Sequence, residues 1–365
     1  MTGLDDGRLA GIRADFPYLA DRAYLNSAGA GLAWRGQSAA AAAYYDDVAS
    51  RGADGQRLWM DLGARARERV ARLLGVPVED ANFFRNTTEV INLAALSVDW
   101  RADDEVVVAA DEFPSVAWPW VRAEATGGRV VRVDPGAESQ REDRLLAAIT
   151  TRTRVVAVSH VNTVTGTRLD LDRLGRACRE VDALLVVDGI QALGAIPVGL
   201  THVDVYAAGV FKWLLSSFGT GIGVFRERAR EMLTPAYRGY RNRPPSTDFG
   251  YADPNYPGLY VLDATLEFLG GVGWPVIHGR VEDLTRRAAD AVRALGIEPI
   301  TPADAQAGIV SFTVEDPTAI TAELLRGGVH VVEKMDTIRV SPHFYNTSAD
   351  VDRFAEALGV ALADR

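Results

Sequence analysis

Short, almost wholly apolar runs alternate with segments of helical spacing through the middle of the chain. The runs are residues 105–110, 129–133, 154–159, 184–188, 203–208 and 222–225. A strand that is apolar at every position is buried on both faces, as happens when helices cover both sides of a parallel sheet. The sequence therefore predicts an α/β fold with a mostly parallel central sheet and right-handed crossovers, and the last run is a candidate antiparallel strand.

Outside this stretch the sequence predicts helices and one long loop. Helical spacing covers residues 4–17 and residues 37–74, where Ser38 opens the second pattern and Gly75 closes it. Residues 237–257 are rich in Gly, Pro, Arg and Tyr, and a loop of that length in a compact domain is often functional.

The last third of the chain reads as a smaller unit. A helix over residues 259–268 is followed, across 275–365, by the order helix, strand, helix, strand, helix. We therefore expect an N-terminal arm over residues 1–20, a large domain over 21–258, and a small α+β domain over 259–365 that includes an interdomain helix.

Charge and cysteine content restrict the function. The formal net charge of the 365-residue chain is -10, so its mean field repels nucleic acid and anionic membranes. No run reaches the roughly 18 apolar residues of a membrane span, and the first 20 residues lack the apolar region of a signal peptide. A single cysteine, Cys178, excludes an internal disulfide and a cysteine-rich zinc site, and suits a reducing cytosol. We expect a cytoplasmic protein with no metal site.

Two residues after buried strands could carry chemistry. Lys212 lies between Phe211 and Trp213, and burial would lower its pKa and make the amine nucleophilic. A surface lysine whose stem covers apolar neighbours is the more common explanation of such a segment. Asp188 ends a predicted strand, where open α/β sheets bind ligands, and Gln191 follows one turn later. Capping of the next helix explains Asp188 about as well.

Three further segments are candidates of the same kind. Asn86-Thr87-Thr88-Glu89 opens a helix, so it is either an anion site or a plain capping box. Arg339 could clamp a carboxylate through its fork of N–H groups or form a surface ion pair. His160, in Ser159-His160-Val161-Asn162-Thr163, is more often a structural histidine than a catalyst when taken alone.

The order and spacing of these segments resemble the class V aminotransferase family of fold-type I pyridoxal-phosphate enzymes. This family includes cysteine desulfurases, isopenicillin-N-epimerase-like proteins and carbon–sulfur lyases. The resemblance runs from Tyr24-Leu25-Asn26-Ser27-Ala28 to Tyr345-Asn346-Thr347 and so covers nearly the whole chain. It implies pyridoxal 5'-phosphate as the cofactor, held in the large domain as an imine on Lys212.

The resemblance also implies roles for the remaining candidates. The implied cofactor contacts are Thr87 and Thr88 on the phosphate, Phe113 on the ring face, Thr163 near the ring, Asp188 on the pyridine nitrogen and Gln191 near the ring oxygen. Arg339 would bind the substrate carboxylate, with Asn26 and Ala28 nearby. Thr220, in Gly219-Thr220-Gly221, would reach the phosphate of a neighbouring subunit, so that a homodimer would share its active sites.

The chain departs from the family pattern at four places. Phe113 replaces the ring-stacking histidine, Phe211 replaces a common histidine before the lysine, and Gly209 replaces a phosphate-binding serine. Arg241 or Arg243 are candidates to replace the lost phosphate contacts. The loop over residues 328–336 carries no cysteine, so a persulfide-forming desulfurase is not expected.

We therefore expect a lyase that breaks a β-substituent bond of a small amino acid, such as the C–S bond of a cysteine conjugate. Class V transamination or epimerisation is the alternative, and a catalytically dead binding protein on the same fold is a lesser one. A nicotinamide dehydrogenase is disfavoured because Gly219-Thr220-Gly221 comes late and leads into a strand rather than a helix.

Overall fold

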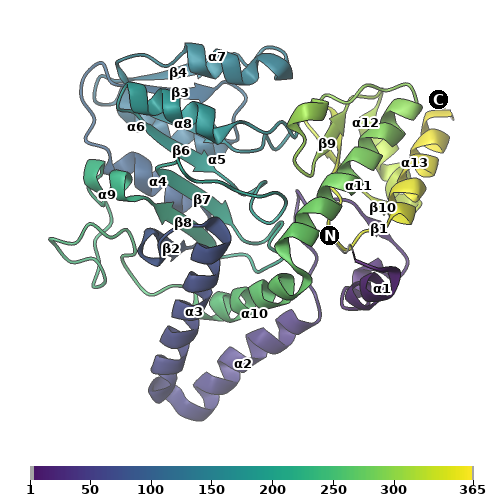
Figure 1. The fold of residues 1–365 in the computed structure, drawn as a ribbon, viewed down its shortest axis with the longest axis horizontal. Helices are drawn as coiled ribbons and strands as arrows, with labels where there is room; N and C mark the ends of the chain where they lie inside the picture. Colours follow the sequence, from purple (N-terminus) through teal and green to yellow (C-terminus); the bar gives the residue numbers. More distant parts are fainter. Residues whose placement is uncertain (1–3, 364–365) are drawn as a thin grey trace.

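The computed structural model describes residues 4–363 and contains a seven-stranded mixed sheet among them (Figure 1). Its spatial order is β2 (Ala81–Phe84), β8 (Gly221–Phe225), β7 (Val205–Gly209), β6 (Leu184–Asp188), β5 (Thr153–Ser159), β3 (Glu105–Ala109) and β4 (Arg129–Val133). The strands from β7 to β4 are parallel, and β8 is antiparallel to both of its neighbours. The predicted α/β class, mostly parallel sheet and antiparallel last strand are confirmed.

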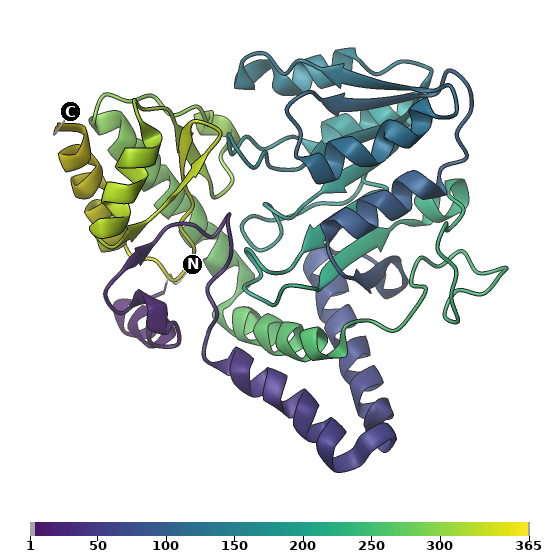
Figure 2. The same cartoon turned by 180° about the vertical axis from the view of Figure 1, so that it is seen from behind.

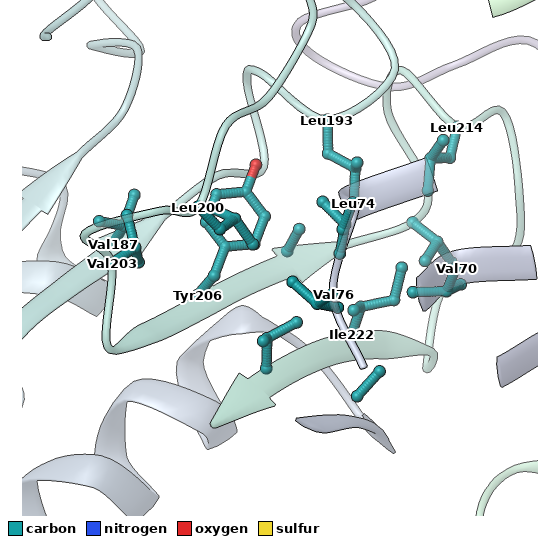
Figure 3. Packing of buried hydrophobic residues seen from close by; sticks show 14 of the residues in the cluster. Val70, Leu74, Val76, Val187, Leu193, Leu200, Val203, Tyr206, Leu214 and Ile222 are labelled. Carbon is teal, nitrogen blue, oxygen red and sulfur yellow. The ribbon is translucent and has the colours of Figure 1, made fainter. Parts of the chain in front are cut away.

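The strands are apolar at successive positions because both faces of the sheet are covered. In β3, Val107 packs into one hydrophobic cluster and Val106 and Val108 pack into the other, as the period of two for strand side chains requires. The first cluster lies under α3 (Gln56–Leu74), α7 (Arg141–Ala147), α8 (Leu171–Glu180) and α10 (Tyr256–Val272), and the second under α4 (Thr87–Ser97), α5 (Pro114–Ala117) and α6 (Val121–Glu124). Figure 3 shows part of the first cluster, where Val70 and Leu74 of α3 lie close to Ile222.

Two predicted helices are broken in the structure. The predicted helix over 37–74 is split into α2 (Gly36–Arg51) and α3 by a 3-10 turn, Gly52–Gly55, because Gly52 adopts a positive φ of 53°. Both views show α2 and α3 as a V-shaped pair beside α10 (Figures 1 and 2). The predicted helix near 115–125 is interrupted by a 3-10 segment, Trp118–Trp120, because Pro119 cannot donate a helical hydrogen bond.

The remaining helices differ from the expectations mainly at their ends. α1 (Asp6–Ala14) begins after Asp5, whose side chain accepts from Arg8 N–H, and α10 extends the predicted 259–268 helix in both directions. The short α9 (Glu227–Met232) was not predicted from the sequence. In the described part of the chain, we find no helix both long enough and apolar enough to cross a bilayer.

The C-terminal part forms a smaller layer of helices on strands. It contains α11 (Trp274–Ala294), β9 (Val310–Phe312), α12 (Pro317–Arg326), β10 (Val329–His330), β11 (Val332–Lys334), β12 (Thr337–Val340) and α13 (Ser348–Ala363). Strands β11, β12 and β9 form an antiparallel sheet. The sequence predicted one strand between the last two helices, whereas the structure has three, because Met335 and Asp336 turn the chain back with positive φ angles and make a hairpin of β11 and β12.

An N-terminal strand joins this C-terminal layer. β1 (Ala23–Tyr24) pairs in parallel with β10, and the side chains of Ala23 and Leu25 pack into the hydrophobic cluster of the C-terminal part. This strand comes from the range 21–258, which the sequence analysis assigned to the large domain. The division at residues 20 and 258 stays a prediction, and this long-range pairing is a feature that a division by sequence range does not describe.

Candidate active site

A cavity of about 140 Å³ opens beside the carboxyl ends of the parallel strands. Ser159 ends β5, Asp188 ends β6, and Lys212 follows β7, so all three side chains reach the same edge of the sheet. The residues that line the cavity are Asn86, Thr87, Thr88, Phe113, Ser115, Ser159, Val161, Thr163, Asp188, Ile190, Gln191, Phe211 and Lys212. The chain therefore brings seven of its predicted site residues together around one space.

Asp188 and Lys212 form the charged pair of this cavity. Burial raises the pKa of Asp188 to about 7, although an N–H from Ile190 at 2.9 Å and the nearby charge of Lys212 favour the carboxylate. Burial, followed by the charge of Arg339, lowers the pKa of Lys212 to about 8, while Asp188 opposes this shift. The amine is thus easily deprotonated near neutral pH, as a nucleophile must be. A surface lysine whose stem covers apolar neighbours would keep its ammonium in water, and its pKa would not be lowered by burial.

The start of α4 supplies donors for an anion. The side chain of Asn86 caps the helix by accepting from Glu89 N–H at 2.8 Å. The hydroxyl of Thr88 lies 2.7 Å from that of Ser115, and both residues line the cavity. Ser115 was not among the residues predicted for the site. The one local feature that could have indicated Ser115 is its position directly after Pro114, at the start of the short helix α5.

Gly209 and Phe211, two of the departures from the family pattern, lie in close packing beside Thr87 and Ile190. The main-chain N–H of Gly209 donates to the Thr87 hydroxyl at 2.8 Å, so this hydroxyl remains free to donate its own proton. A side chain at Gly209 would place its Cβ 3.0 Å from Ile190 and 3.1 Å from the ring of Phe211. The Phe211 ring in turn stacks on Phe218 at 4.1 Å. A side chain at residue 209 would therefore require a small shift of these apolar neighbours.

Arg241 and Arg243 do not lie at this cavity in the described chain. Arg241 forms an ion pair with Asp253 at 2.7 Å and lines a separate pocket with Arg67 and Tyr256. Arg243 is exposed. The suggestion that either arginine replaces the phosphate contacts within one subunit is not supported by this arrangement, because the long loop that carries them packs against β2 and α10 instead.

Gln191, Thr163 and Arg339 form one hydrogen-bonded chain. Gln191 Nε2 donates to the Thr163 hydroxyl at 2.9 Å and to the Ala28 carbonyl at 3.0 Å, and Trp213 Nε1 donates to Gln191 Oε1 at 3.0 Å. Arg339 Nη1 donates to Thr163 through both its carbonyl and its hydroxyl. Arg339 is 3% exposed, its Nε has no partner, and burial lowers its pKa to about 10. A buried guanidinium with an unpaired N–H is stabilised when an anion binds to it.

The N-terminal segment over residues 26–31 packs against the loop that carries Lys212. Gly31 N–H donates to the carbonyl of Phe211 at 2.8 Å, and a Cβ on Gly31 would collide with the carbonyl of Lys212, so only glycine fits. Asn26 bridges to Ser341, and its buried side-chain oxygen has no partner. The segment thus places Asn26 and Ala28 beside the Arg339 end of the site. Their contact with substrate stays a prediction.

A second carboxyl, that of Glu112, contacts Ser159 of the cavity wall. Glu112 accepts from both the N–H and the hydroxyl of Ser159, at 2.8 and 2.7 Å, and burial raises its pKa. Ser159 is the β5 partner of Asp188 in the sheet register. The next residue, Phe113, lines the cavity and is 39% exposed. Glu112, unlike Phe113, was not predicted as a site residue, because only the tertiary fold brings it to the end of β5.

Three other candidates lie outside this cavity in the described chain. Thr220 is buried, and its hydroxyl contacts Asn255 rather than the chain's own site. His160 faces a different surface pocket, with Arg168 among its neighbours, and burial lowers its pKa to about 3. Cys178 is fully buried in α8, and burial raises its pKa to about 12. The interpretation of His160 as a structural histidine agrees with its position.

The cavity fits pyridoxal 5'-phosphate chemically. A desolvated amine can bind the aldehyde, a carboxyl at the end of β6 can face a ring nitrogen, and the helix start with its hydroxyls can hold a phosphate. The unsatisfied Arg339 guanidinium suits a substrate carboxylate. Fold and site together define an enzyme of fold-type I that uses pyridoxal phosphate.

The family model "Aminotransferase class-V" matches residues 23–354, so the chain belongs to this family. Isopenicillin N epimerase of Amycolatopsis lactamdurans is 34% identical over 80% of this chain and 83% of that protein. A probable cysteine desulfurase of Aeropyrum pernix is 30% identical over 82% of this chain and 84% of its own length.

Solved structures agree with this family membership. Cysteine desulfurase CsdA of Escherichia coli superposes with a TM-score of 0.85 at 26% identity, covering 97% of this chain and 98% of that one. The cystine C–S lyase C-DES, solved with cysteine persulfide, gives a TM-score of 0.85 at 23% identity, covering 94% and 99%, and shows the common fold. The protein is a class V enzyme that depends on pyridoxal phosphate.

Proposed function

We propose that this enzyme is a lyase that cleaves the Cβ–S bond of a cysteine conjugate without a catalytic cysteine. The observation that carries the proposal is the position of Cys178, the one cysteine in the sequence. Its side chain is 0% exposed in α8, on the covered face of the sheet, and a raised pKa keeps it a thiol. A nucleophile must reach the substrate as a thiolate, which Cys178 does not do from there.

The titratable groups of the cavity suit removal of an α-proton by one base. Among the described residues that line it, the side chains that can exchange protons near neutral pH are Lys212 and Asp188. Lys212 Nζ would take the proton from the substrate α-carbon, and Asp188 would hold a proton at the pyridine nitrogen. When bound, the cofactor supplies a ring that accepts the electron pair released at that carbon.

Arg339 and Thr163 would orient the substrate. The guanidinium would bind the α-carboxylate, and this contact directs the α-hydrogen toward Lys212. The C–H bond at Cα and the C–S bond at Cβ then break, and the thiolate leaves and takes up a proton. Hydrolysis of the remaining enamine consumes one water, so that the conjugate and water give a thiol, pyruvate and ammonium.

Epimerisation is the second candidate, because isopenicillin N epimerase is among the most similar relatives. Inversion at Cα requires proton delivery to the face opposite the removed proton. Phe113, which is expected to stack on the ring face, has no exchangeable proton to deliver. This residue favours elimination over inversion. Transamination uses the same lysine and differs only in where the proton returns.

Product analysis tests the proposal. Purified holoenzyme is incubated with S-substituted cysteines and a panel of common amino acids, and thiol, pyruvate, ammonium, keto acid and D-enantiomer are measured. Stoichiometric thiol, pyruvate and ammonium support the lyase. A keto acid that forms only with an added amino donor, or inversion without thiol release, contradicts it.

We further infer a homodimer with shared active sites, as a soluble cytoplasmic enzyme. Thr220 does not line the chain's own cavity, and the neighbouring Phe218, which stacks on Phe211, is 70% exposed. Trp118 is also 61% exposed. Light scattering after gel filtration would give twice the chain mass. In mixtures of Lys212→Ala with Thr220→Ala subunits, partial recovery of activity supports sites built from two chains.

A further inference from the structure

A second cation stands on the same face of the β11–β12 hairpin as Arg339. In the antiparallel register Val332 pairs with Arg339 and Lys334 pairs with Thr337. Directly paired residues point to the same face, and so do residues two apart along a strand. Lys334 and Arg339 are therefore diagonal neighbours on one face, whose side chains originate about 7–8 Å apart.

That face is turned toward the active-site cavity. Arg339 reaches inward to Thr163, which lines the cavity. Lys334 extends over the ring of Phe113, with Nζ 5.9 Å from the ring centroid, and Phe113 is also part of the cavity wall. The positive charge of Lys334 also contributes to the lowered pKa of Lys212. The ammonium of Lys334 thus stands at the rim of the same cavity.

Lys334 has no ion-pair partner among the described residues. Within residues 4–363 no carboxylate forms an ion pair with its ammonium. Glu333 directly precedes Lys334 but lies on the opposite face of the hairpin, where it pairs with the buried Ile338. A half-buried cation above an aromatic ring, without a counter-ion, is stabilised when an anion arrives.

The other anionic groups of the reaction are already assigned to other donors. The start of α4 suits the cofactor phosphate, and Arg339 suits the α-carboxylate. Lys334 lies over the ring of Phe113 in the cavity wall and has no anion assigned to it. We propose that Lys334 is a specificity residue that binds a carboxylate on the sulfur substituent, so that the substrate is a cysteine thioether carrying a second acid. The inference rests on the proposed lyase function.

A matched substrate pair tests the subsite through turnover. S-carboxymethyl-L-cysteine and its amide, S-carbamoylmethyl-L-cysteine, have nearly the same shape and differ in charge. We expect wild-type kcat/KM to favour the acid by about five-fold, as for a partly exposed charge pair. Lys334→Met should bring the ratio to about one, and Lys334→Arg should restore the preference. The control Glu333→Gln, on the opposite face, should leave it unchanged.

A binding measurement separates this inference from the lyase proposal. Glutarate and its monoamide lack an amino group and do not react, and their affinity for holoenzyme is measured by titration calorimetry. Tighter binding of glutarate to wild-type protein but not to Lys334→Met supports the subsite even if no thiol is ever released. Equal affinities in the wild type, or a preference that persists in Lys334→Met, would overturn the subsite whatever the reaction is.

Discussion

Arg339 donates to Thr163 twice, with Nη1 2.6 Å from the main-chain carbonyl and 3.1 Å from the hydroxyl. Gln191 Nε2 donates to the same hydroxyl from the other side. A hydroxyl that accepts two hydrogen bonds has one proton left to donate, and Thr163 lines the cavity. Arg339, the proposed ligand of the substrate carboxylate, and the cavity are therefore connected through a single side chain.

Replacing this hydroxyl should weaken both ends of the connection. In Thr163→Val, Arg339 loses one of its two acceptors and Gln191 one of its two, so KM should rise about ten-fold, the cost of an unsatisfied buried donor. The visible absorption of the holoenzyme should also change its pH dependence. Thr163→Ser keeps the hydroxyl and should behave like the wild type in both measurements. A Thr163→Val enzyme with normal KM and spectrum would show that Thr163 only fills space.

Lys212 should make the apoprotein less stable at moderate pH. Its folded pKa is lowered from 10.5 to about 8, so the stability that it contributes is present above pH 10.5 and is lost as the pH falls through 8. Lys212→Met removes this dependence. The gain of the variant over wild-type apoprotein, from urea unfolding, should be about 1–2 kcal/mol larger at pH 8 than at pH 10. An equal difference at both pH values would mean that the amine is not desolvated. The same variant should lose the visible band and all turnover.

Cys178 should be dispensable for turnover. It lies in the hydrophobic cluster beneath α8, so Cys178→Ala removes packing and should lower the free energy of unfolding by about 1 kcal/mol. Because its pKa is raised to about 12, iodoacetamide should not modify the native protein at pH 7.5, whereas the unfolded protein should react. Loss of thiol release in a folded Cys178→Ala enzyme would argue for a catalytic cysteine and against the proposed lyase.

Glu112 should raise the pH at which Asp188 ionises. Asp188 ends β6 and Glu112 follows β3, and Ser159 of the intervening strand β5 donates to Glu112. The charge of Glu112 contributes to the raised pKa of Asp188. Glu112→Gln keeps the shape and removes the charge, so the acidic limb of the pH profile of kcat/KM should move to lower pH. The spectral titration of the holoenzyme should move in the same direction. An unchanged profile would leave Glu112 as a purely structural partner of Ser159.

Much of the central domain could be predicted because its signals are local. Strands such as β3 and β6 are apolar at every position and bounded by turn residues, which indicates burial on both faces without knowledge of the neighbours. Lys212, Asp188 and Thr87 each follow such a strand or open a helix. The shared edge of a parallel sheet is enough to bring them together. The break at Gly52 was not predicted, because a glycine inside a helical pattern does not by itself end the helix.

The contacts that refine the site could not be predicted in this way. Ser115 on Thr88, Glu112 on Ser159 and Lys334 over Phe113 join segments that the sequence separates by at least 27 residues. The pairing of β1 with β10 is of the same kind.

The amino-acid sequence by itself determined the layered α/β class and the position of the lysine and the acid at one edge of the sheet. It also determined that residues 328–336 contain no cysteine. Only the tertiary structure decided which hydroxyls, carboxyls and cations surround that lysine. The physical reason is that periodicity reports whether a face is buried, whereas the partner across the interface is chosen by packing between distant segments.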